Sequence, residues 1–252
     1  METKTLHFSN KEWRYHCAGD APLTLLVLSG SLGASAGTAS IISSILPAVR
    51  IVMPEYSPVQ KASEMLNALD AILDQEKIAR FSLCASSFGG LIAQAWARRH
   101  PTRISHLILA GATPPNPKRV ASHLRSLQIL KFVPLWMIHS ALSVRLLAML
   151  HKEQSLKWKD EYKQLIARLT KVDFASRYQI AIDLDQNYHY SANDLPESMQ
   201  ILILEGKTDH RLQLGNLYPH AVTYVFSCAG HSMMITQTVE WVEVVSKFLR
   251  FP

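Results

Sequence analysis

The fold of this chain is decided by the stretch Arg80-Phe81-Ser82-Leu83-Cys84-Ala85-Ser86-Ser87-Phe88-Gly89-Gly90-Leu91-Ile92-Ala93-Gln94. It begins as an apolar strand, passes through a turn of small residues and continues as a helix. Ser87 stands at the apex, where a sharp strand-to-helix turn lifts one side chain out over a sheet. The crowded turn needs small neighbours, which Ala85 and Gly89 provide. An ordinary serine in a strand-to-helix loop would fit the same residues, so the rest of the chain must decide.

Composition limits the classes of protein that this chain can belong to. The 252 residues are 48% hydrophobic and 18% charged, which suits one α/β domain with an insertion or two small domains. The net charge is +6, but the basic residues are scattered and no basic run is interleaved with stacking aromatic residues. We therefore expect a small-molecule ligand and no nucleic acid.

The cysteines and the apolar segments indicate a compartment. Cys17, Cys84 and Cys228 lie far apart, without the spacing of a metal site or of a disulfide framework, which fits a reducing compartment. The first residues contain no apolar signal-peptide core, and no window of about 18 uncharged apolar residues predicts a membrane-spanning helix. We expect a cytoplasmic protein without a bound metal or organic cofactor. Its oligomeric state is left open.

Strands and helices alternate along most of the chain. Two short strands within 6–17 form a predicted hairpin at a sheet edge. Further apolar strands are predicted at 23–28, 49–53, 104–110, 200–204 and 222–226, and helices at 39–46, 59–75, 91–99 and 239–249. Continuous apolar strands separated by helices predict a mostly parallel sheet covered on both faces. The fold class is therefore α/β.

The alternation stops between Asn116 and Asn193, where only helical patterns occur, including 120–131, 135–150 and 156–169. We predict a helical cap at 116–193, inserted into a core formed by 1–115 and 194–252. The stretch 127–139 is very apolar. Packing on the core explains most of it, and a lipophilic pocket wall or transient membrane contact would explain the surplus. Phe132 and Trp136, together with Leu32, are the predicted pocket residues.

Two later residues could activate Ser87. A serine hydroxyl needs a base to take its proton and an acid to orient that base. Asp209 follows the strand at 200–204, and His231 follows the strand at 222–226 within Gly230-His231. Ligands of open parallel sheets bind at the carboxyl ends of strands, where all three side chains would meet. The stretch between Asp209 and His231 has room for only a turn or two of helix near 212–217, so Asp183 and Asp185 remain alternative acids.

Stabilisation of a developing oxyanion requires fixed N–H donors. The backbone N–H of Phe88 begins the helix after Ser87, where the helix dipole assists it. The second donor is predicted in the glycine-rich loop after the strand at 23–28, at the N–H of Ser31 or Leu32. A flexible connector would have the same composition.

The residues Ser29-Gly30-Ser31, Ala85 to Gly90, Asp209 and Gly230-His231 resemble those of the α/β-hydrolase superfamily over nearly the whole chain. Within it, Gly37-Thr38-Ala39 and Gly89 to Gln94 are similar to the maspardin branch. The resemblance implies a serine esterase or thioesterase that acts through Ser87, His231 and Asp209. A hydrolase or lyase of carbon–carbon bonds, or a non-catalytic scaffold, remains the alternative. Many relatives have His-Gly where this chain has Ser29-Gly30, so the oxyanion loop can differ in shape.

Overall fold

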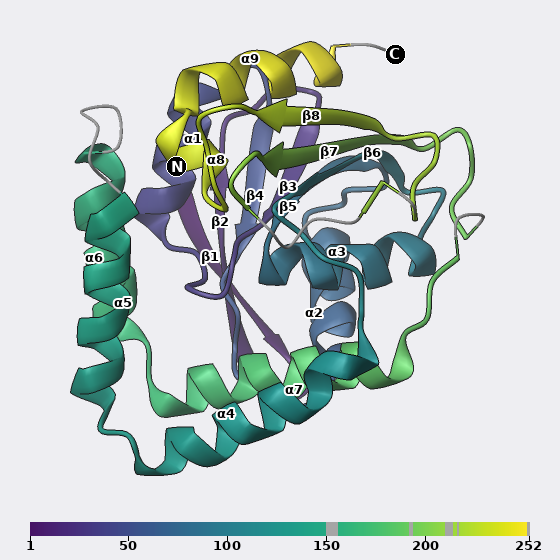
Figure 1. Cartoon of the computed structure of the whole chain (residues 1–252). Coiled ribbons are helices and arrows are strands. Elements are labelled where there is room, and N and C mark those ends of the chain that lie inside the picture. Colours follow the sequence, from purple (N-terminus) through teal and green to yellow (C-terminus); the bar gives the residue numbers. More distant parts are fainter. Residues whose placement is uncertain (150–155, 192–193, 210–213, 216, 251–252) are drawn as a thin grey trace.

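A computed structural model describes residues 1–149, 156–191, 194–209, 214–215 and 217–250. Within these residues, eight strands form one sheet in the order β1-β2-β4-β3-β5-β6-β7-β8 (Figure 1). β1 pairs antiparallel with β2, β2 pairs antiparallel with β4, and all other neighbours are parallel. The strands are β1 Glu2–Phe8, β2 Lys11–Ala18, β3 Thr24–Leu28, β4 Arg50–Pro54, β5 Phe81–Ser86, β6 Ile104–Ala110, β7 Gln200–Gly206 and β8 Val222–Phe226.

The hairpin predicted at the N-terminal sheet edge is confirmed, with longer strands than expected. Its turn residues Ser9 and Asn10 have φ of 50° and 58°. Two successive left-handed residues match the right-handed twist of the flanking strands, which is why short hairpins favour such turns. The hairpin leaves β1 as the edge strand and attaches the parallel part of the sheet through β2.

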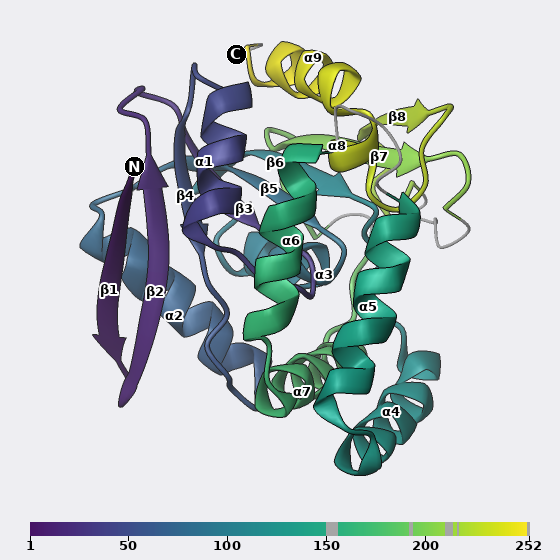
Figure 2. The same ribbon diagram turned by 90° about the vertical axis from the view of Figure 1, so that its left-hand side faces the viewer.

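Helices cover both faces of the sheet because the central strands are apolar on both sides. In β3, Leu26 and Leu28 pack into the hydrophobic cluster under α2 (Ala62–Gln75) and α3 (Phe88–Arg99), whereas Leu25 and Val27 pack into the cluster under α1 (Ala36–Ile45) and α9 (Thr238–Leu249). The short helix α8 (Met233–Thr236) belongs to the second cluster. Figure 2 shows the two helical layers on either side of the sheet. The predicted α/β fold class is confirmed.

Residues 116–193, which we call the cap segment, lie between β6 and β7. They contain the short 3₁₀ helix η1 (Pro117–Arg119), α4 (Val120–Phe132), α5 (Leu135–Met149), α6 (Leu156–Arg168) and α7 (Lys171–Asn187). Figure 1 shows α5 and α6 standing beside the carboxyl ends of the strands, and α4 and α7 running beneath the core. Whether the segment is a domain of its own, as predicted, stays a prediction. The short helix expected near 212–217 falls largely outside the described residues.

Hydrogen bonds attach the cap segment to the core at two places. The Ser176 hydroxyl accepts a hydrogen bond from the N–H of Val59 at 2.8 Å and donates to the carbonyl of Val59 at 2.7 Å. The Ser35 hydroxyl donates to the Glu161 carboxylate. Ser35 caps α1, so Glu161 of α6 lies at the amino end of that helix, where negative charge is favoured. These hydrogen bonds fix α6 and α7 against the core.

Candidate active site

The turn between β5 and α3 holds Ser87 in a backbone conformation that few residues adopt. Ser87 has φ 50° and ψ −116°, and its N–H donates to the carbonyl of Ala110 at 3.0 Å. A Cβ on Gly89 would lie 2.3 Å from the carbonyl oxygen of Leu28. A Cβ on Gly90 would lie 2.4 Å from the side-chain Cβ of Ala112. The glycines therefore let the turn sit directly against its neighbours, and Ser87 has a strained conformation of the kind that clusters at functional sites.

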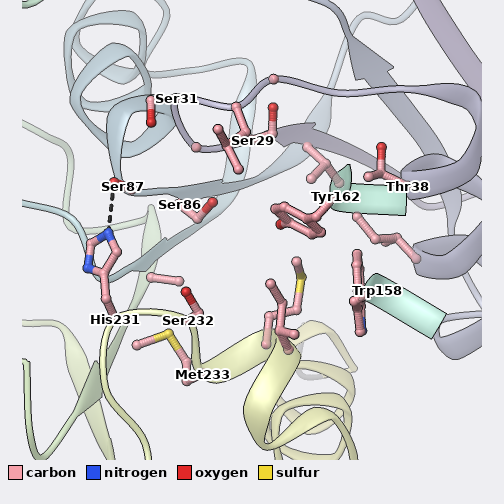
Figure 3. Close-up of a pocket in the computed structure, with 18 of the residues that line it drawn as sticks. Ser29, Ser31, Thr38, Ser86, Ser87, Trp158, Tyr162, His231, Ser232 and Met233 are labelled. Atoms are coloured by element: carbon pink, nitrogen blue, oxygen red, sulfur yellow. Dashed lines mark hydrogen bonds between the residues drawn. The ribbon is translucent and has the colours of Figure 1, made fainter. Parts of the chain in front are cut away.

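Three side chains from three strand ends form a continuous hydrogen-bonded chain. His231 Nε2 lies 2.8 Å from Ser87 Oγ, and His231 Nδ1 lies 2.6 Å from Asp209 Oδ2. Figure 3 shows the first of these contacts. The Asp209 side chain is 4% exposed and that of His231 is 24% exposed, so the carboxylate is shielded and the imidazole is accessible. A buried carboxylate on Nδ1 fixes the tautomer that leaves Nε2 free to accept the serine proton.

Backbone contacts between loops bring the histidine to this position. Gly111, directly after β6, has φ 54°, and a Cβ there would lie 3.1 Å from His231 Nδ1. A Cβ on Gly206, at the end of β7, would lie 2.2 Å from the carbonyl oxygen of Gly230. The loops after β7 and β8 are thus in direct contact, which explains how a short connection can place both Asp209 and His231 at the site.

The two alternative acids serve other purposes. Asp183 accepts a hydrogen bond from the N–H of Ala62 at 2.7 Å, at the amino end of α2. Asp185 is fully buried and accepts hydrogen bonds from Arg119, with Oδ1 at 2.6 Å from the guanidinium. Burial alone would raise the pKa of the Asp185 carboxyl, but hydrogen bonds from His123 and Arg119 outweigh it and hold the pKa below its usual range. Neither carboxylate approaches His231 in the structure.

The predicted oxyanion donors lie on either side of Ser87. Phe88 is the first residue of α3, and the first N–H groups of a helix have no carbonyl acceptor within it. The loop after β3 forms a turn in which the N–H of Gly33 donates to the carbonyl of Gly30 at 3.0 Å, with Ser31 and Leu32 at its centre. A Cβ on Gly30 would lie 3.6 Å from Ser87 Cβ, so this turn touches the serine.

The loop that carries the predicted donor Ser31 is fixed by contacts with Tyr56, which also packs on Phe88. The Tyr56 hydroxyl donates to the carbonyl of Ser29 at 2.6 Å, and the Tyr56 ring meets the Phe88 ring edge to face with centroids 5.4 Å apart. Burial raises the pKa of Tyr56, so the phenol stays protonated and keeps donating. Tyr56 therefore links the loop that carries Ser31 to the residue that carries the other predicted donor.

A cavity of about 240 Å³ extends sideways from Ser87. Figure 3 shows Ser87 and His231 at one end and Trp158 and Tyr162 at the other. Ser31 lies near the first end, and Thr38 lies beside the two aromatic rings at the second. The rest of the lining includes Ser29, Ser86, Ser232 and Arg145 and the apolar residues Ile42, Met53, Leu146 and Trp241. The arrangement suits a molecule with one reactive polar group and one apolar arm.

The comparison with known proteins follows from this geometry. A family model described as the alpha/beta hydrolase fold matches residues 13–238. The chain belongs to this family. No curated protein sequence matches the chain, so the likeness to maspardin stays a prediction.

Solved structures of α/β-hydrolases cover almost all of the chain. One is a hydrolase from Pseudomonas aeruginosa, with a TM-score of 0.80 and 14% identity over 99% of this chain and 98% of that one. A structure from work on carboxylesterases of Nitrososphaera gargenis has a TM-score of 0.77 and 16% identity over 98% and 97%. The enol-lactonase of Burkholderia xenovorans has a TM-score of 0.74 and 18% identity over 98% and 100%. Identities this low show the shared fold alone.

The pocket residues predicted from sequence are partly wrong. Leu32 lines the cavity of this α/β-hydrolase, whereas Phe132 and Trp136 lie outside it, with 84% and 68% of their surface exposed. The reason is that α5 reaches the cavity with its later residues, Leu142, Arg145 and Leu146, and not with its first turn. Trp158 and Tyr162 were missed. Their spacing of four residues, within an otherwise charged helix, is the signal that could have identified them.

Burial raises the pKa of three other ionisable groups near the site. Burial raises the pKa of Cys84, which also lines the cavity, to about 12, so no thiolate competes with Ser87. Burial and the neighbouring Glu161 carboxylate raise the pKa of Tyr162 to about 12. Burial and the charge of Asp209 raise the pKa of Glu205. No cluster of three or more His, Cys, Asp or Glu side chains suited to a metal ion occurs in the part of the chain that the structure describes.

Proposed function

We propose that the protein is a serine hydrolase that cleaves a carboxylic ester or thioester with a lipophilic acyl part. The observation that carries this proposal is the chain of hydrogen bonds from Asp209 through His231 to Ser87 at the mouth of an apolar cavity. Each residue has the position that its role needs: a strained apex for the nucleophile, an accessible imidazole for the base and a shielded carboxylate for the acid.

The reaction proceeds in two halves. Ser87 Oγ attacks the acyl carbon while His231 Nε2 accepts its proton, and the carbonyl π electrons move onto oxygen. The tetrahedral intermediate collapses with loss of the alcohol or thiol, which takes the proton from His231. Water then attacks the acyl-enzyme while His231 Nε2 accepts one of its protons. The second tetrahedral intermediate collapses with breakage of the bond between the acyl carbon and Ser87 Oγ, which takes the proton from His231 as the carboxylic acid leaves. These steps need neither a metal nor an organic cofactor.

The oxyanion of each intermediate forms beside two fixed donors. The N–H of Phe88 begins α3 directly after Ser87, and the Gly30–Gly33 turn, which contains Ser31, is in contact with Ser87. One such donor typically contributes about 3–4 kcal/mol to transition-state stabilisation because it is oriented before charge develops. The Tyr56 hydrogen bond to Ser29 keeps this turn in place, so the donor costs little reorganisation.

The aromatic end of the cavity supports a lipophilic acyl group. Trp158 lies at this end, and Ile42, Met53, Trp158 and Trp241, which line the cavity, are each buried to 98% or more. An alkyl or aryl arm placed there removes apolar surface from water at about 25 cal/mol per Å². A short acyl group such as acetyl would leave this end unfilled and gain little.

A fluorophosphonate probe tests the nucleophile directly. We expect the native protein and the Ser86→Ala variant to label, and Ser87→Ala to remain unlabelled. Ser86 is the matched control because it is adjacent, lines the same cavity and carries the same hydroxyl. Labelling that persists in Ser87→Ala would refute the assignment. A native protein that fails to label would favour the non-catalytic scaffold.

A series of p-nitrophenyl esters from acetyl to dodecanoyl tests the acyl pocket. We expect kcat/KM to rise with chain length until the cavity is filled, and Trp158→Ala to shift the optimum toward longer chains. Trp136→Ala serves as control because this residue lies outside the cavity and is 68% exposed. A native preference for acetyl, with no response to Trp158→Ala, would remove the lipophilic acyl part from the proposal.

A further inference from the structure

The turn between α4 and α5 carries an unusual group of exposed apolar side chains. We call residues 128–137 the cap corner. Ile129, Phe132 and Trp136 are 60%, 84% and 68% exposed, and Met137 is 46% exposed. Figure 1 shows the corner at the lower edge of the molecule, away from the sheet. Single exposed apolar residues are common on soluble proteins, but four within nine positions form a patch that needs a partner.

The helix that leads into the cap corner is not a core helix. None of the residues of α4 is buried, although Leu124, Leu127, Ile129, Leu130 and Phe132 belong to it. Its packing is confined mainly to α7 and η1. The apolar content of α4 therefore exceeds what folding uses. The corner is nevertheless held in a fixed place, because Lys171 Nζ donates to the carbonyl of Lys131 at 3.2 Å and His139 Nε2 lies 2.8 Å from the carbonyl of Leu169.

The charged side chains of the two helices that meet at the cap corner have one sign. The sequence contains no Asp or Glu between Glu76 and Glu153, so α4 and α5 carry only cations. Arg125 and Lys131 are exposed and form no ion pair with any residue that the structure describes. Lys171 adds a third cation next to the corner. The nearest acid on α7, Asp173, is engaged by the N–H and hydroxyl of Thr170.

We propose that the cap corner docks on an anionic lipid bilayer, with Phe132 and Trp136 inserted at the interface and Lys131, Arg125 and Lys171 facing the headgroups. Aromatic side chains favour the boundary between headgroups and acyl chains, and each basic residue near such a surface contributes further. None of the described helices is long and apolar enough to cross a bilayer, so the contact is interfacial. This proposal does not depend on the proposed catalytic activity.

The exposure of the aromatic pair favours a bilayer over a protein partner. Phe132 and Trp136 project from a turn rather than line a groove, and their exposed fractions are among the largest of any apolar residue in the described part of the chain. A protein interface would need a complementary pocket for each projecting ring. A fluid interface accepts projecting rings of any arrangement, and its anionic headgroups match the cations of α4 and α5.

Tryptophan fluorescence offers a direct test. Trp13, Trp96, Trp158 and Trp241 are exposed by 2% or less, whereas Trp136 is 68% exposed. Trp136 is therefore the one tryptophan of the five whose emission responds to a change at the surface. We expect a blue shift when vesicles of equal parts phosphatidylcholine and phosphatidylserine are added to the full-length protein, and no shift in Trp136→Phe. Pure phosphatidylcholine vesicles should produce a much smaller shift.

Vesicle sedimentation with matched variants measures each contribution. Lys131→Gln removes one cation and should weaken binding about fivefold, because about 1 kcal/mol per basic residue is typical. Phe132→Ser should weaken binding further. Val239→Ser is the control, because Val239 is 58% exposed on α9, far from the corner in Figure 1. All three side chains are exposed or lie on the surface of a helix, so the variants should keep the native melting temperature.

Several outcomes would overturn the proposal. No blue shift and no sedimentation with anionic vesicles would refute it. The same holds if the protein binds pure phosphatidylcholine vesicles as tightly as anionic vesicles and Lys131→Gln does not weaken the binding. A blue shift that grows with protein concentration in the absence of lipid would assign the corner to a contact between copies of the chain. Saturable binding of an acidic protein that Phe132→Ser abolishes, without any vesicle binding, would assign it to a protein partner.

Discussion

Replacement of Gly89 by alanine tests whether close backbone contact determines the conformation of the turn between β5 and α3. The added Cβ would lie 2.3 Å from the carbonyl oxygen of Leu28 and 2.4 Å from that of Ser29. Both atoms belong to the backbone at the end of β3, so no rotamer change can relieve the overlap. Either α3 must move away from the sheet or the end of β3 must shift.

The expected cost follows from the size of this displacement. Overpacking of this kind costs about 1–3 kcal/mol, partly offset by the better helix propensity of alanine, about 1 kcal/mol. The net cost is therefore about 0–2 kcal/mol, and at about 2–4 °C per kcal/mol for a domain of this size the melting temperature should fall by up to about 8 °C. Catalysis should suffer more, because a shift of about 1 Å between Ser87 and His231 costs about 100-fold in rate. Thermal unfolding by circular dichroism and the rate of fluorophosphonate labelling measure the two effects.

Two further glycines provide the controls. Gly215→Ala should be neutral or slightly stabilising, because nothing lies within 4 Å of the added Cβ. Gly90→Ala should be rescued by Ala112→Gly, because its overlap of 2.4 Å is with a side-chain Cβ. A Gly89→Ala protein with the native melting temperature and the native rate of fluorophosphonate labelling would refute the reasoning. Rescue of Gly89→Ala by a side-chain substitution alone would do the same.

Three other predictions concern the strained serine and the buried carboxylates. Ser87→Gly should raise the melting temperature while abolishing labelling, since glycine adopts φ 50° without the strain of about 1–3 kcal/mol. Asp209→Asn should lower kcat by about 10³–10⁴, whereas Asp185→Asn should alter stability and leave the labelling rate of the folded protein intact. Burial raises the pKa of the Asp185 carboxyl, but hydrogen bonds from His123 and Arg119 lower it by more, so the native pKa lies below the ordinary value of about 4. The ionised carboxylate therefore stabilises the fold above about pH 4, and this contribution is lost as the pH falls through the lowered native pKa. A melting temperature that declines below about pH 4 no more steeply in the native protein than in Asp185→Asn would contradict this.

The sequence predicts the core and the position of Ser87 well because both are encoded locally. The runs at 104–110 and 222–226 coincide with β6 and β8 at both ends. Burial explains the apolar run of the inner strand β6, whose residues are all buried except Ser105. In the edge strand β8 only Phe226 is buried, and the β-branched and aromatic residues are the signal. Asp209 and His231 could be named because each directly follows such a strand. Parallel strands then bring their carboxyl ends to one edge without any further information.

The cap segment is predicted less well because its helices have no single apolar face. Apolar residues surround α4, so periodicity gives no direction for Phe132, and the same holds for Trp136 on α5. Composition alone suggests that such residues are buried, and the structure shows that they are exposed. In α6, by contrast, Trp158 and Tyr162 stand out from charged neighbours, and that contrast correctly marks the face turned to the core.

The cap segment and the three side chains Ser87, Asp209 and His231 differ in how they are positioned. Contacts between residues far apart in the sequence position the cap segment. Ser176 contacts Val59 across 117 positions and Glu161 contacts Ser35 across 126, and such contacts decide where α7 and α6 lie against the core. No local pattern encodes them. The triad side chains depend on strand ends that each form from local sequence, so substitutions in the cap segment should alter which acyl groups reach Ser87 before they alter its reactivity. The Trp158→Ala variant measures the two effects separately: kcat/KM across the ester series reports acyl-group selection, and the fluorophosphonate labelling rate reports the reactivity of Ser87. A change in the first without a change in the second would show that the cap segment selects the substrate, whereas the core positions the reacting groups.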